Sequence, residues 1–262
     1  MSWSAVLQSY ARLKDPEKDL PPGVWLASDD ATLTIFDGFE KAKFHFLVLP
    51  RDPFPLANGG ILASSSLDSL STLVKSPDKL QVLRALKRQA FEVKEMIEDE
   101  MQKEYGWTWA IHVGFHAVES MKHVHLHVIS SDMISDRLKN KKHWNSFRPD
   151  LGFFLHLDDV IDRVEAGTFN LKNRKEYEAL LKTDLALPRP SSRSIRNIPE
   201  LKTALVSKWE EDRLARTVEL GVDEARVAGR SGRREREATA HDRDEGTEAE
   251  RESTNKKRAK LD

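Results

Sequence analysis

Three histidines alternate with aliphatic residues in the middle of the chain, in the run His123-Val-His-Leu-His-Val128. Successive side chains of a β-strand point to opposite faces, so the run predicts a strand over 123–129 with His123, His125 and His127 on one face. The aliphatic residues of the other face are suited to a core. The histidine face must therefore line a polar site.

Imidazoles grouped in this way can bind a metal ion or take part in phosphoryl transfer. The alternative to both is an exposed strand face that has no function. Neutral imidazoles are good zinc ligands, and His-x-His on a strand is a known ligand spacing. A neutral imidazole can also attack phosphorus and form a phosphoramidate, which divides one difficult displacement into two easier ones. Neighbouring imidazoles would then hold the phosphate oxygens and donate protons, which suits a reaction that depends on positioning and charge stabilisation.

The composition narrows the class of protein. The chain has 262 residues, a formal net charge of −1 and no cysteine. The absence of cysteine excludes disulfides, Cys-ligated zinc, iron–sulfur clusters and a Cys nucleophile, and it suits a reducing compartment. No apolar run is long enough to span a membrane and no signal peptide is evident, so we expect no membrane partner.

The elements that must position the histidines can be predicted from periodicity. Strands are expected over 31–36, 44–49 and 107–115 in addition to 123–129. The spacing of apolar residues predicts a helix in the first 14 residues and a long helix over 77–105 with one buried stripe. Further helices are expected over 153–164, 176–182 and 200–209. The order of these elements predicts an α+β fold.

The end of the chain has a different composition. After Trp209 there is no aromatic residue, and from Gly221 onward Arg, Glu, Asp and Lys dominate. Such a segment cannot bury enough apolar area to offset its chain entropy, so we predict a disordered charged tail over 216–262. Its last residues, Asn255-Lys-Lys-Arg-Ala-Lys-Leu-Asp262, form a basic cluster typical of nuclear localisation signals, so the expected compartment is the nucleus.

The histidine run and its flanks resemble the aprataxin family of the histidine-triad (HIT) superfamily. The run matches the superfamily signature, and three flanking segments narrow the resemblance to aprataxin: 37–50, 114–121 and 138–147. The similarity covers about residues 25 to 209, with Glu40 and Glu119 where the family usually has proline. It implies a HIT-like antiparallel sheet with flanking helices, in a catalytic domain over 1–183 that includes the N-terminal helix.

The resemblance implies a role for each of five histidines. His125 matches the nucleophile that becomes adenylated, and His123 and His127 match its flanking phosphate ligands. His45 matches a histidine that supports the triad from the neighbouring strand, with a buried core histidine as the alternative. His116 matches a position near the leaving DNA phosphate.

Further positions match the family's nucleotide and DNA contacts. The implied AMP- or nucleotide-binding residues are Asp37 at the ribose, Phe39 on the adenine, Lys41, Ser120, Met121 and Ser130. Ser131 is an equal candidate to Ser130 for assisting the phosphate. The implied DNA-binding residues are Lys139, Lys142 and His143. Trp3 and Tyr10 of the N-terminal helix are further DNA-binding candidates, because aromatic rings can stack on the exposed base pair at a nick. A solvated basic loop and ordinary packing of the N-terminal helix are the respective alternatives.

The aprataxin family usually carries a small zinc finger after the catalytic domain. Here the two Cys positions align with Leu187 and Pro190 and the two His positions with Ala204 and Lys208, and none of these residues can hold zinc. We therefore expect 184–215 to be a zinc-finger-like remnant, with no metal and no cofactor. Its helix should dock through Leu201, Leu205 and Trp209. The alternative is that this region never was a finger.

These features together imply a DNA 5′-adenylate hydrolase that acts in DNA single-strand break repair. It would remove AMP from abortive ligation intermediates through a covalent AMP–histidine intermediate. The expected partners are 5′-adenylated DNA at nicked or broken ends or at RNA–DNA junctions, with AMP as the product. Two alternatives stay open: a general HIT-family nucleotide or phosphoramidate hydrolase, and a non-catalytic DNA-end-binding protein.

Overall fold

The computed structural model describes residues 3–187 and 195–219, except for the side chains of Trp3 and 217–219. The chain divides into two compact units, Met1–Glu98 with Trp109–Glu210 and Asp99–Thr108 with Glu211–Asp262. The predicted disordered tail over 216–262 lies outside the described residues from 220 onward, and the prediction is wrong for 216–219, which are helical. None of the described helices combines the length and apolar character that crossing a membrane would require.

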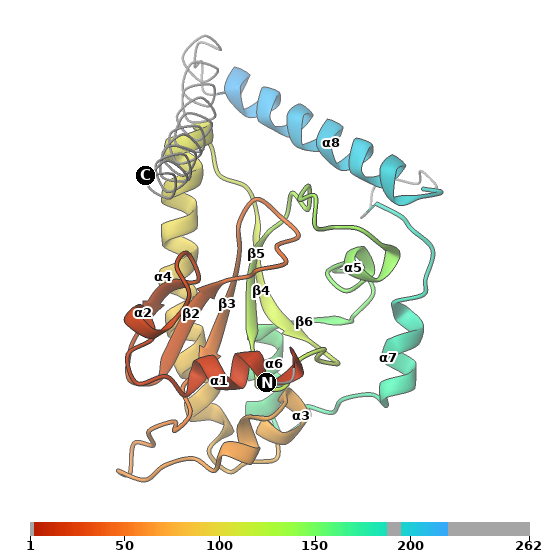
Figure 1. Cartoon of the computed structure of the whole chain (residues 1–262). Helices are drawn as coiled ribbons and strands as arrows, with labels where there is room; N and C mark the ends of the chain where they lie inside the picture. The colour runs from red at the N-terminus through yellow and green to blue at the C-terminus, as the bar shows by residue number, and fades with distance from the viewer. Residues whose placement is uncertain (1–2, 188–194, 220–262) are drawn as a thin grey trace, which may run out of the picture. The chain divides into compact units, whose positions relative to one another are not determined.

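A six-stranded antiparallel sheet forms the first unit, with the strand order β1-β2-β3-β5-β4-β6 (Figure 1). The predicted α+β class and the antiparallel sheet are thereby confirmed. The strands are β1 (Trp25–Ser28), β2 (Thr32–Phe36), β3 (His45–Pro50), β4 (Ile111–His116), β5 (Leu126–Ser130) and β6 (Phe154–His156).

Helices lie on both faces of this sheet, and Figure 1 shows α1 in front of it and α4 behind it. A buried hydrogen bond of 3.1 Å between Thr32 of β2 and Gln89 of α4 joins the rear helix to the sheet. The helices are α1 (Val6–Ala11), α2 (Pro16–Asp19), α3 (Leu70–Leu73), α4 (Lys79–Tyr105), α5 (Lys141–Asn145), α6 (Leu157–Glu165), α7 (Arg174–Leu180) and α8 (Ile198–Glu219). Two 3₁₀ turns, η1 (Trp3–Ala5) and η2 (Ser64–Leu67), complete the described elements.

The front face of the sheet is divided between two kinds of residue. Over β2 and β3, apolar side chains pack with Leu7 of α1 into a buried cluster that contains Leu33, Ile35, Leu47 and Leu49. Over β5 and β4, the same face carries histidines. Helix α1 therefore covers one half of the face and leaves the other half to the site.

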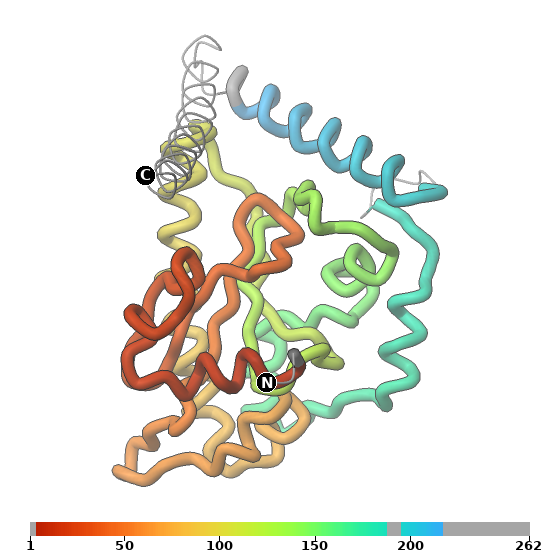
Figure 2. Tube along the Cα trace, viewed as in Figure 1, coloured from red at the N-terminus to blue at the C-terminus, as the bar shows by residue number. Residues whose placement is uncertain are grey.

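The strand that carries the histidine run is shorter than predicted, because β5 begins at Leu126 instead of 123. His123 has φ of 90°, which lies outside the β region of backbone conformation. Its N–H donates to Asp68 O, and the Val124 N–H donates to Leu67 O, so this stretch pairs with the end of η2. Figure 2 shows the connection from β3 to α4 passing beside this stretch.

Two further differences concern short elements. Helix α6 begins at Leu157, because the residues before it form β6 and pair with β4. Strand β1, which the sequence analysis did not predict, pairs with β2. A short apolar run fits either a helix or a strand, and here the partner strands decide.

Gly114 lies where β4 and β6 approach closely. A Cβ atom at this position would come within 2.4 Å of Leu155 O and 2.6 Å of Phe154 Cε1. The backbone of β6 cannot yield as a flexible side chain would. Only glycine therefore fits on β4 at the residue that pairs with His127.

We predict that Gly114→Ala lowers the free energy of unfolding by about 1–3 kcal/mol, the usual cost of overpacking a core. The matched control is Gly38→Ala, since a Cβ at Gly38 meets nothing within 4 Å. Its free energy of unfolding should stay within about 0.5 kcal/mol of the parent. Urea unfolding measures both values, and equal stabilities for the two variants would contradict the close approach of β4 and β6.

Candidate active site

Strand register brings histidines from three strands to one face of the sheet. His127 of β5 pairs with Leu47 of β3 on one side and with Gly114 of β4 on the other. His45 and His116 each lie two residues from those partners, so their side chains share the face of His127. The ring centroids of His45 and His116 are 5.2 Å and 4.3 Å from that of His127.

His125 completes this histidine cluster, which we define as His45, His116, His125 and His127. Its ring centroid is 5.2 Å from that of His127. His125, His127 and His45 are 7%, 5% and 4% exposed, so the imidazoles lie in a largely dry environment. Burial lowers the pKa of His125, which therefore stays neutral at physiological pH.

The hydrogen bonds of His125 determine which ring nitrogen can react. Its Nδ1 lies 2.8 Å from the carbonyl oxygen of His123 and must donate to it, because a carbonyl only accepts. In the neutral ring, Nε2 then carries the lone pair. His125 consequently presents an unprotonated, nucleophilic Nε2.

A relay of hydrogen bonds places the proton of His127 on Nε2, whereas the proton of His125 lies on Nδ1. The backbone N–H of Lys41 donates to His45 Nδ1 over 3.2 Å, so the proton of neutral His45 is on Nε2. That proton points to His127 Nδ1 at 3.0 Å, which leaves His127 with its own proton on Nε2. Among the described residues, this buried Nε2 has no hydrogen-bond partner. It is therefore a donor available to an oxygen atom of a bound phosphate.

His116 supplies a second buried nitrogen without a partner. Its Nε2 forms no hydrogen bond in the described part of the chain. Burial lowers the pKa of both His116 and His127 well below the usual range for histidine. Unsatisfied buried polar atoms are costly, so two of them on one face indicate a ligand that satisfies them.

The structure does not place His123 in the cluster. Its ring is fully buried, and Nε2 donates to the carbonyl oxygen of Pro50 at 2.7 Å. Its contribution to His125 is instead the carbonyl oxygen that holds Nδ1. The direct phosphate contact expected for His123 stays a prediction, and the observed contacts indicate a positioning residue.

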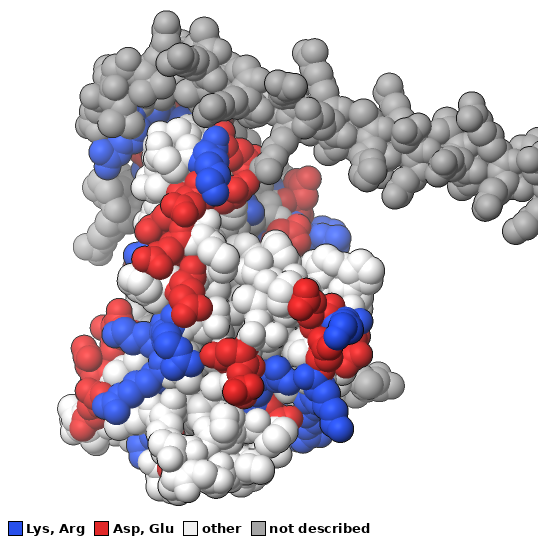
Figure 3. All heavy atoms as spheres, turned by 90° about the vertical axis from the view of Figure 1, so that its left-hand side faces the viewer, with Lys and Arg blue, Asp and Glu red and all other residues white. Residues whose placement is uncertain are grey.

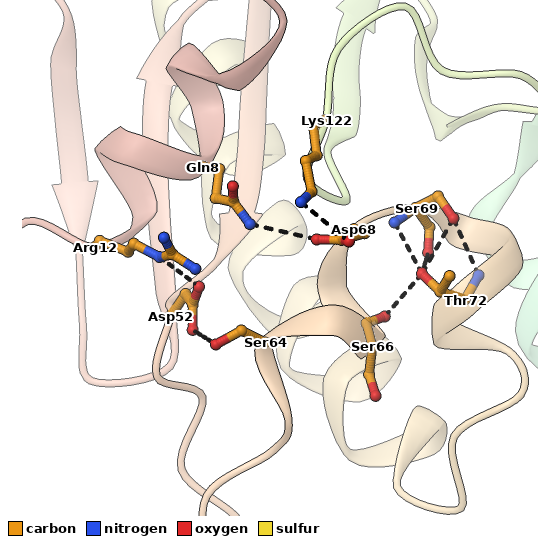
Figure 4. A network of polar contacts seen from close by, with 9 residues as sticks. All are labelled: Gln8, Arg12, Asp52, Ser64, Ser66, Asp68, Ser69, Thr72 and Lys122. Atoms are coloured by element: carbon orange, nitrogen blue, oxygen red, sulfur yellow. Dashed lines mark hydrogen bonds and ion pairs between the residues drawn. The ribbon is translucent and has the colours of Figure 1, made fainter. Parts of the chain in front are cut away.

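A polar network anchors the segment around His123 to the N-terminal helix (Figure 4). Asp68 accepts from Gln8 of α1 at 3.3 Å and forms an ion pair with Lys122 at 3.1 Å. Asp52 accepts from Arg12 at 2.7 Å and from Ser64 at 2.6 Å. Helix α1 thereby stabilises the backbone that presents His125.

Phe147 covers the histidine cluster, and the sequence analysis did not single it out as a site residue. Its ring centroid lies 5.4 Å from His45, 4.6 Å from His116 and 5.3 Å from His127. This burial lowers the pKa of His45 to about 4. Phe147 lies in the segment 138–147 that resembles aprataxin. Phenylalanine is apolar, so its residue type alone does not indicate a role in catalysis or binding.

The predicted nucleotide-binding residues Asp37, Phe39 and Lys41 gather beside His45. An Asp37 carboxylate oxygen lies 3.3 Å from His45 Nε2, and the other carboxylate oxygen accepts from the Phe39 N–H at 2.8 Å. The Lys41 ammonium donates to the Phe39 carbonyl, and burial lowers its pKa. Phe39 is 47% exposed, and the Lys41 ammonium lies 6.0 Å from its ring centroid.

A metal ion at this site would have to be bound by Asp37, His45 and His127. One oxygen and two nitrogens of these residues lie within 4.8 Å of one another. The distances from His45 Nε2, 3.0 Å to His127 and 3.3 Å to Asp37, are those of hydrogen bonds. A proton shared among the three groups accounts for this arrangement.

The other predicted nucleotide-binding residues lie apart from the cluster. Ser130 is fully buried, and its hydroxyl accepts from the Phe44 N–H and donates to Asp132. Met121 packs against the apolar cluster under α1. Ser120 is exposed in the loop after β4. A phosphate contact by Ser130 stays a prediction that these hydrogen bonds do not support.

The predicted DNA-binding residues fall into two groups. Lys139, Lys142 and His143 lie in and before α5, where the Lys139 N–H donates to His143 Nδ1 at 3.1 Å. Tyr10 packs partly buried against the apolar cluster under α1, as expected for ordinary packing of that helix. The side chain of Trp3 lies outside the described residues.

The segment that was predicted to be a zinc-finger remnant packs through apolar contacts where the structure describes it. Leu201, Ala204 and Leu205 of α8 are buried in a cluster with Trp144, and Leu187 packs against it. Trp209 is 8% exposed, and its ring meets that of Trp109 at 5.6 Å. The predicted docking through Leu201, Leu205 and Trp209 is therefore observed. Lys208 is exposed, and Pro190 lies outside the described residues.

We predict that acid destabilises the protein between pH 6.5 and about 4. Burial lowers the pKa of His45 and His123 to about 4, so the unfolded chain binds protons that the folded chain excludes. Their stabilising contribution is complete above pH 6.5 and is lost as the pH falls. Each should lower the free energy of unfolding by roughly 2 kcal/mol from pH 7.5 to pH 5.

Urea unfolding at both pH values tests this prediction. A folded His45→Gln variant should show a smaller difference between the two pH values than the parent. A free energy of unfolding that does not change between pH 7.5 and pH 5 would show that these imidazoles are not held neutral by burial.

Comparison with known proteins agrees with this geometry. Residues 4–143 match the family model described as "Scavenger mRNA decapping enzyme C-term binding". Aprataxin of Ciona intestinalis is 33% identical over 200 residues, which are 76% of this chain and 44% of that protein. Aprataxin of Danio rerio is 35% identical over 163 residues, 62% of this chain and 41% of that protein. The chain thus spans less than half the length of these two relatives.

A shorter relative and a solved structure match more completely. An aprataxin-like protein of Saccharomyces cerevisiae is 31% identical over 171 residues, 61% of this chain and 75% of that protein. The crystal structure of the aprataxin ortholog Hnt3 in complex with DNA has a TM-score of 0.62 and 25% identity, covering 83% of this chain and 100% of that one. Sequence and fold agree, and the chain belongs to the aprataxin-like family of HIT proteins.

Proposed function

We propose that this chain is a DNA 5′-adenylate hydrolase of the HIT family, which removes AMP from abortive ligation intermediates in DNA single-strand break repair. The observation that carries the proposal is the unprotonated Nε2 of His125, held beside buried imidazole nitrogens that lack partners. Family membership supports it. Hnt3 has been solved in complex with DNA and in complex with DNA and guanosine, which supports DNA as the partner.

In the first step, His125 Nε2 attacks the α-phosphorus of the adenylate. The N–P bond forms while the P–O bond to the pyrophosphate bridge breaks, and the electron pair leaves on the 5′-phosphate of the DNA. A phosphate anion is a stable leaving group and requires no prior protonation. The hydrogen bond from Nδ1 to the His123 carbonyl stabilises the positive charge that His125 acquires.

In the second step, a water molecule attacks the same phosphorus. The P–N bond breaks, its electron pair returns to His125 Nε2, and AMP is released. The water loses a proton to an unprotonated imidazole nitrogen, for which His116 Nε2 is our candidate, and the proton then passes to solvent.

The surrounding groups stabilise the charge on the phosphate in both steps. His127 Nε2 offers a fixed hydrogen bond, and Lys41, which is 8% exposed, offers a positive charge. Phe147 limits water above the cluster. Fixed donors in a dry site are worth far more than the same donors in bulk water.

We predict that His125→Ala lowers AMP release from a 5′-adenylated nick by about three orders of magnitude or more, because no other group can form the intermediate. His125→Asn should fold like the parent and be equally inactive. His112, on β4 outside the cluster, supplies the matched control, and His112→Asn should retain activity. Turnover by His125→Ala above the trace level would show that the nucleophile is assigned wrongly.

We also propose that the reaction requires no metal. Dialysis against EDTA should leave both the rate of AMP release and the free energy of unfolding unchanged, because a proton already links His45 to Asp37 and His127. Activity that is lost in EDTA and restored by zinc would instead establish a metal site at these residues.

The preference for DNA is a separate part of the proposal. A general nucleotide or phosphoramidate hydrolase would cleave AMP-lysine and adenylated DNA with comparable kcat/KM, whereas the proposed enzyme should prefer adenylated DNA. A DNA-end binder without catalysis would cleave neither substrate. We propose the nucleus as the compartment; the basic cluster that suggests it lies outside the described residues.

A further inference from the structure

A cavity of about 370 Å³ lies beside the histidine cluster, between the loop after β4, helix α5 and helix α7. Its wall includes Phe153, whose ring centroid is 5.4 Å from that of His116. Ser120, Lys142, Arg174 and Lys182 also line it. Two of these, Ser120 and Lys142, are residues for which the sequence analysis predicted substrate contacts, and the other two come from α7 and its end.

Buried polar contacts hold the walls of this cavity in place. Asn145 of α5 is fully buried, and its amide donates to the carbonyl oxygens of Leu181 at 3.2 Å and Thr183 at 2.7 Å. Arg148 donates to the carbonyl of Asp184 at 2.9 Å. The end of α7, which carries Lys182, is therefore fixed against α5, which carries Lys142, before any ligand arrives.

The charges around the cavity favour an anion. Arg174 forms an ion pair of 2.8 Å with Glu178, which neutralises that carboxylate. Lys142 and Lys182 are exposed and form no ion pair with the other described residues, and Glu119 is the remaining acid of the lining. The unpaired ammonium groups face a common space of a size that suits a small ligand or part of a larger one.

A different side of the molecule carries charges of both signs. In Figure 3, basic and acidic side chains interleave over the face that α4 presents. The ion pairs Arg84–Glu165, Lys87–Asp158 and Arg88–Asp29 account for part of that mixture. Basic groups that are already paired attract a phosphate backbone less than the unpaired lysines of the cavity.

We infer that this cavity is a second phosphate subsite, which binds a phosphodiester of the DNA strand that carries the adenylated 5′ end. The inference rests on the proposed function and extends it to Arg174 and Lys182. Lys142 from α5 and Lys182 from the segment after α7 hold the phosphate, and Ser120 lines the same cavity. The subsite would give the enzyme its preference for a polynucleotide over a small AMP conjugate.

The experiment compares two substrates that differ only in the presence of further phosphodiesters. One is a single 5′-adenylated nucleotide, and the other is a 5′-adenylated oligonucleotide at a nick. Lys182→Ala should raise KM for the oligonucleotide about tenfold, as expected for loss of one charge-assisted contact, with little change on the mononucleotide. The slope of log KM against log salt concentration should also become shallower by about 0.9 for one lost phosphate contact.

Lys175→Ala is the matched control, because Lys175 is an exposed lysine of the same helix that does not line the cavity. Arg174→Ala should act in the same direction as Lys182→Ala. The inference is overturned if Lys182→Ala and Lys175→Ala behave alike on the oligonucleotide. It is also overturned if Lys182→Ala weakens both substrates equally, since the cavity would then belong to the nucleotide pocket.

The two levels of the proposal can be separated. If the parent protein cleaves neither substrate, the proposed function itself fails. If the parent cleaves both and the variants show no selective loss on the oligonucleotide, the function stands and the second subsite fails.

Discussion

The hydrogen bond between His125 Nδ1 and the carbonyl oxygen of His123 determines which nitrogen of the ring can act as a nucleophile. A carbonyl cannot donate, so the proton must lie on Nδ1 and the lone pair on Nε2. The relay from Lys41 N–H through His45 to His127 has the opposite result, a proton on Nε2. Two neighbouring imidazoles are thereby made chemically different by their hydrogen-bond partners alone.

This arrangement requires that the imidazoles stay neutral. Phe147 and the sheet around them exclude water, and burial lowers the pKa of each member of the cluster. The same burial leaves the Nε2 atoms of His116 and His127 without partners. The site therefore carries a cost in stability that a bound phosphate would offset, as is common where polar atoms are held ready for a substrate.

The backbone conformation of His123 also depends on distant parts of the chain. Its φ of 90° is unfavourable for a residue with a side chain, and it persists because Asp68, Leu67 and Pro50 hold the segment on several sides. Asp68 is itself held by Gln8 of α1 (Figure 4). Helix α1 thus supports the nucleophile, in addition to packing on the sheet.

Helix α8 is held by apolar packing along its first turns. Ala204, which the sequence analysis matched to a lost zinc ligand, is buried with Leu201 and Leu205 beside Trp144. Burial of apolar surface stabilises such a docked helix. Trp209 continues the contact as far as Trp109 and the Lys43 ammonium, which lies 4.7 Å from its ring.

Much of the site followed from the sequence, because residue type and local spacing determine it. The alternation in 123–128 predicted that His125 and His127 share a face, and apolar periodicity predicted β2, β3 and α4 within a few residues. The match of segments 37–50 and 114–121 to aprataxin identified His45 and His116, which the structure brings beside His127.

Other features were decided by contacts between residues far apart in the chain, which no local pattern encodes. The early end of the strand at Leu126 results from pairing of His123 and Val124 with η2, and β6 exists only because β4 offers it an edge. Phe147 became part of the site because α5 places it over three histidines. The cavity beside α7 depends on the buried Asn145 amide, whose partners lie more than thirty residues away in the sequence. The sequence by itself determined which groups could react, and the tertiary structure decided where each proton lies and which surfaces meet the substrate, because hydrogen-bond partners and burial are set by packing.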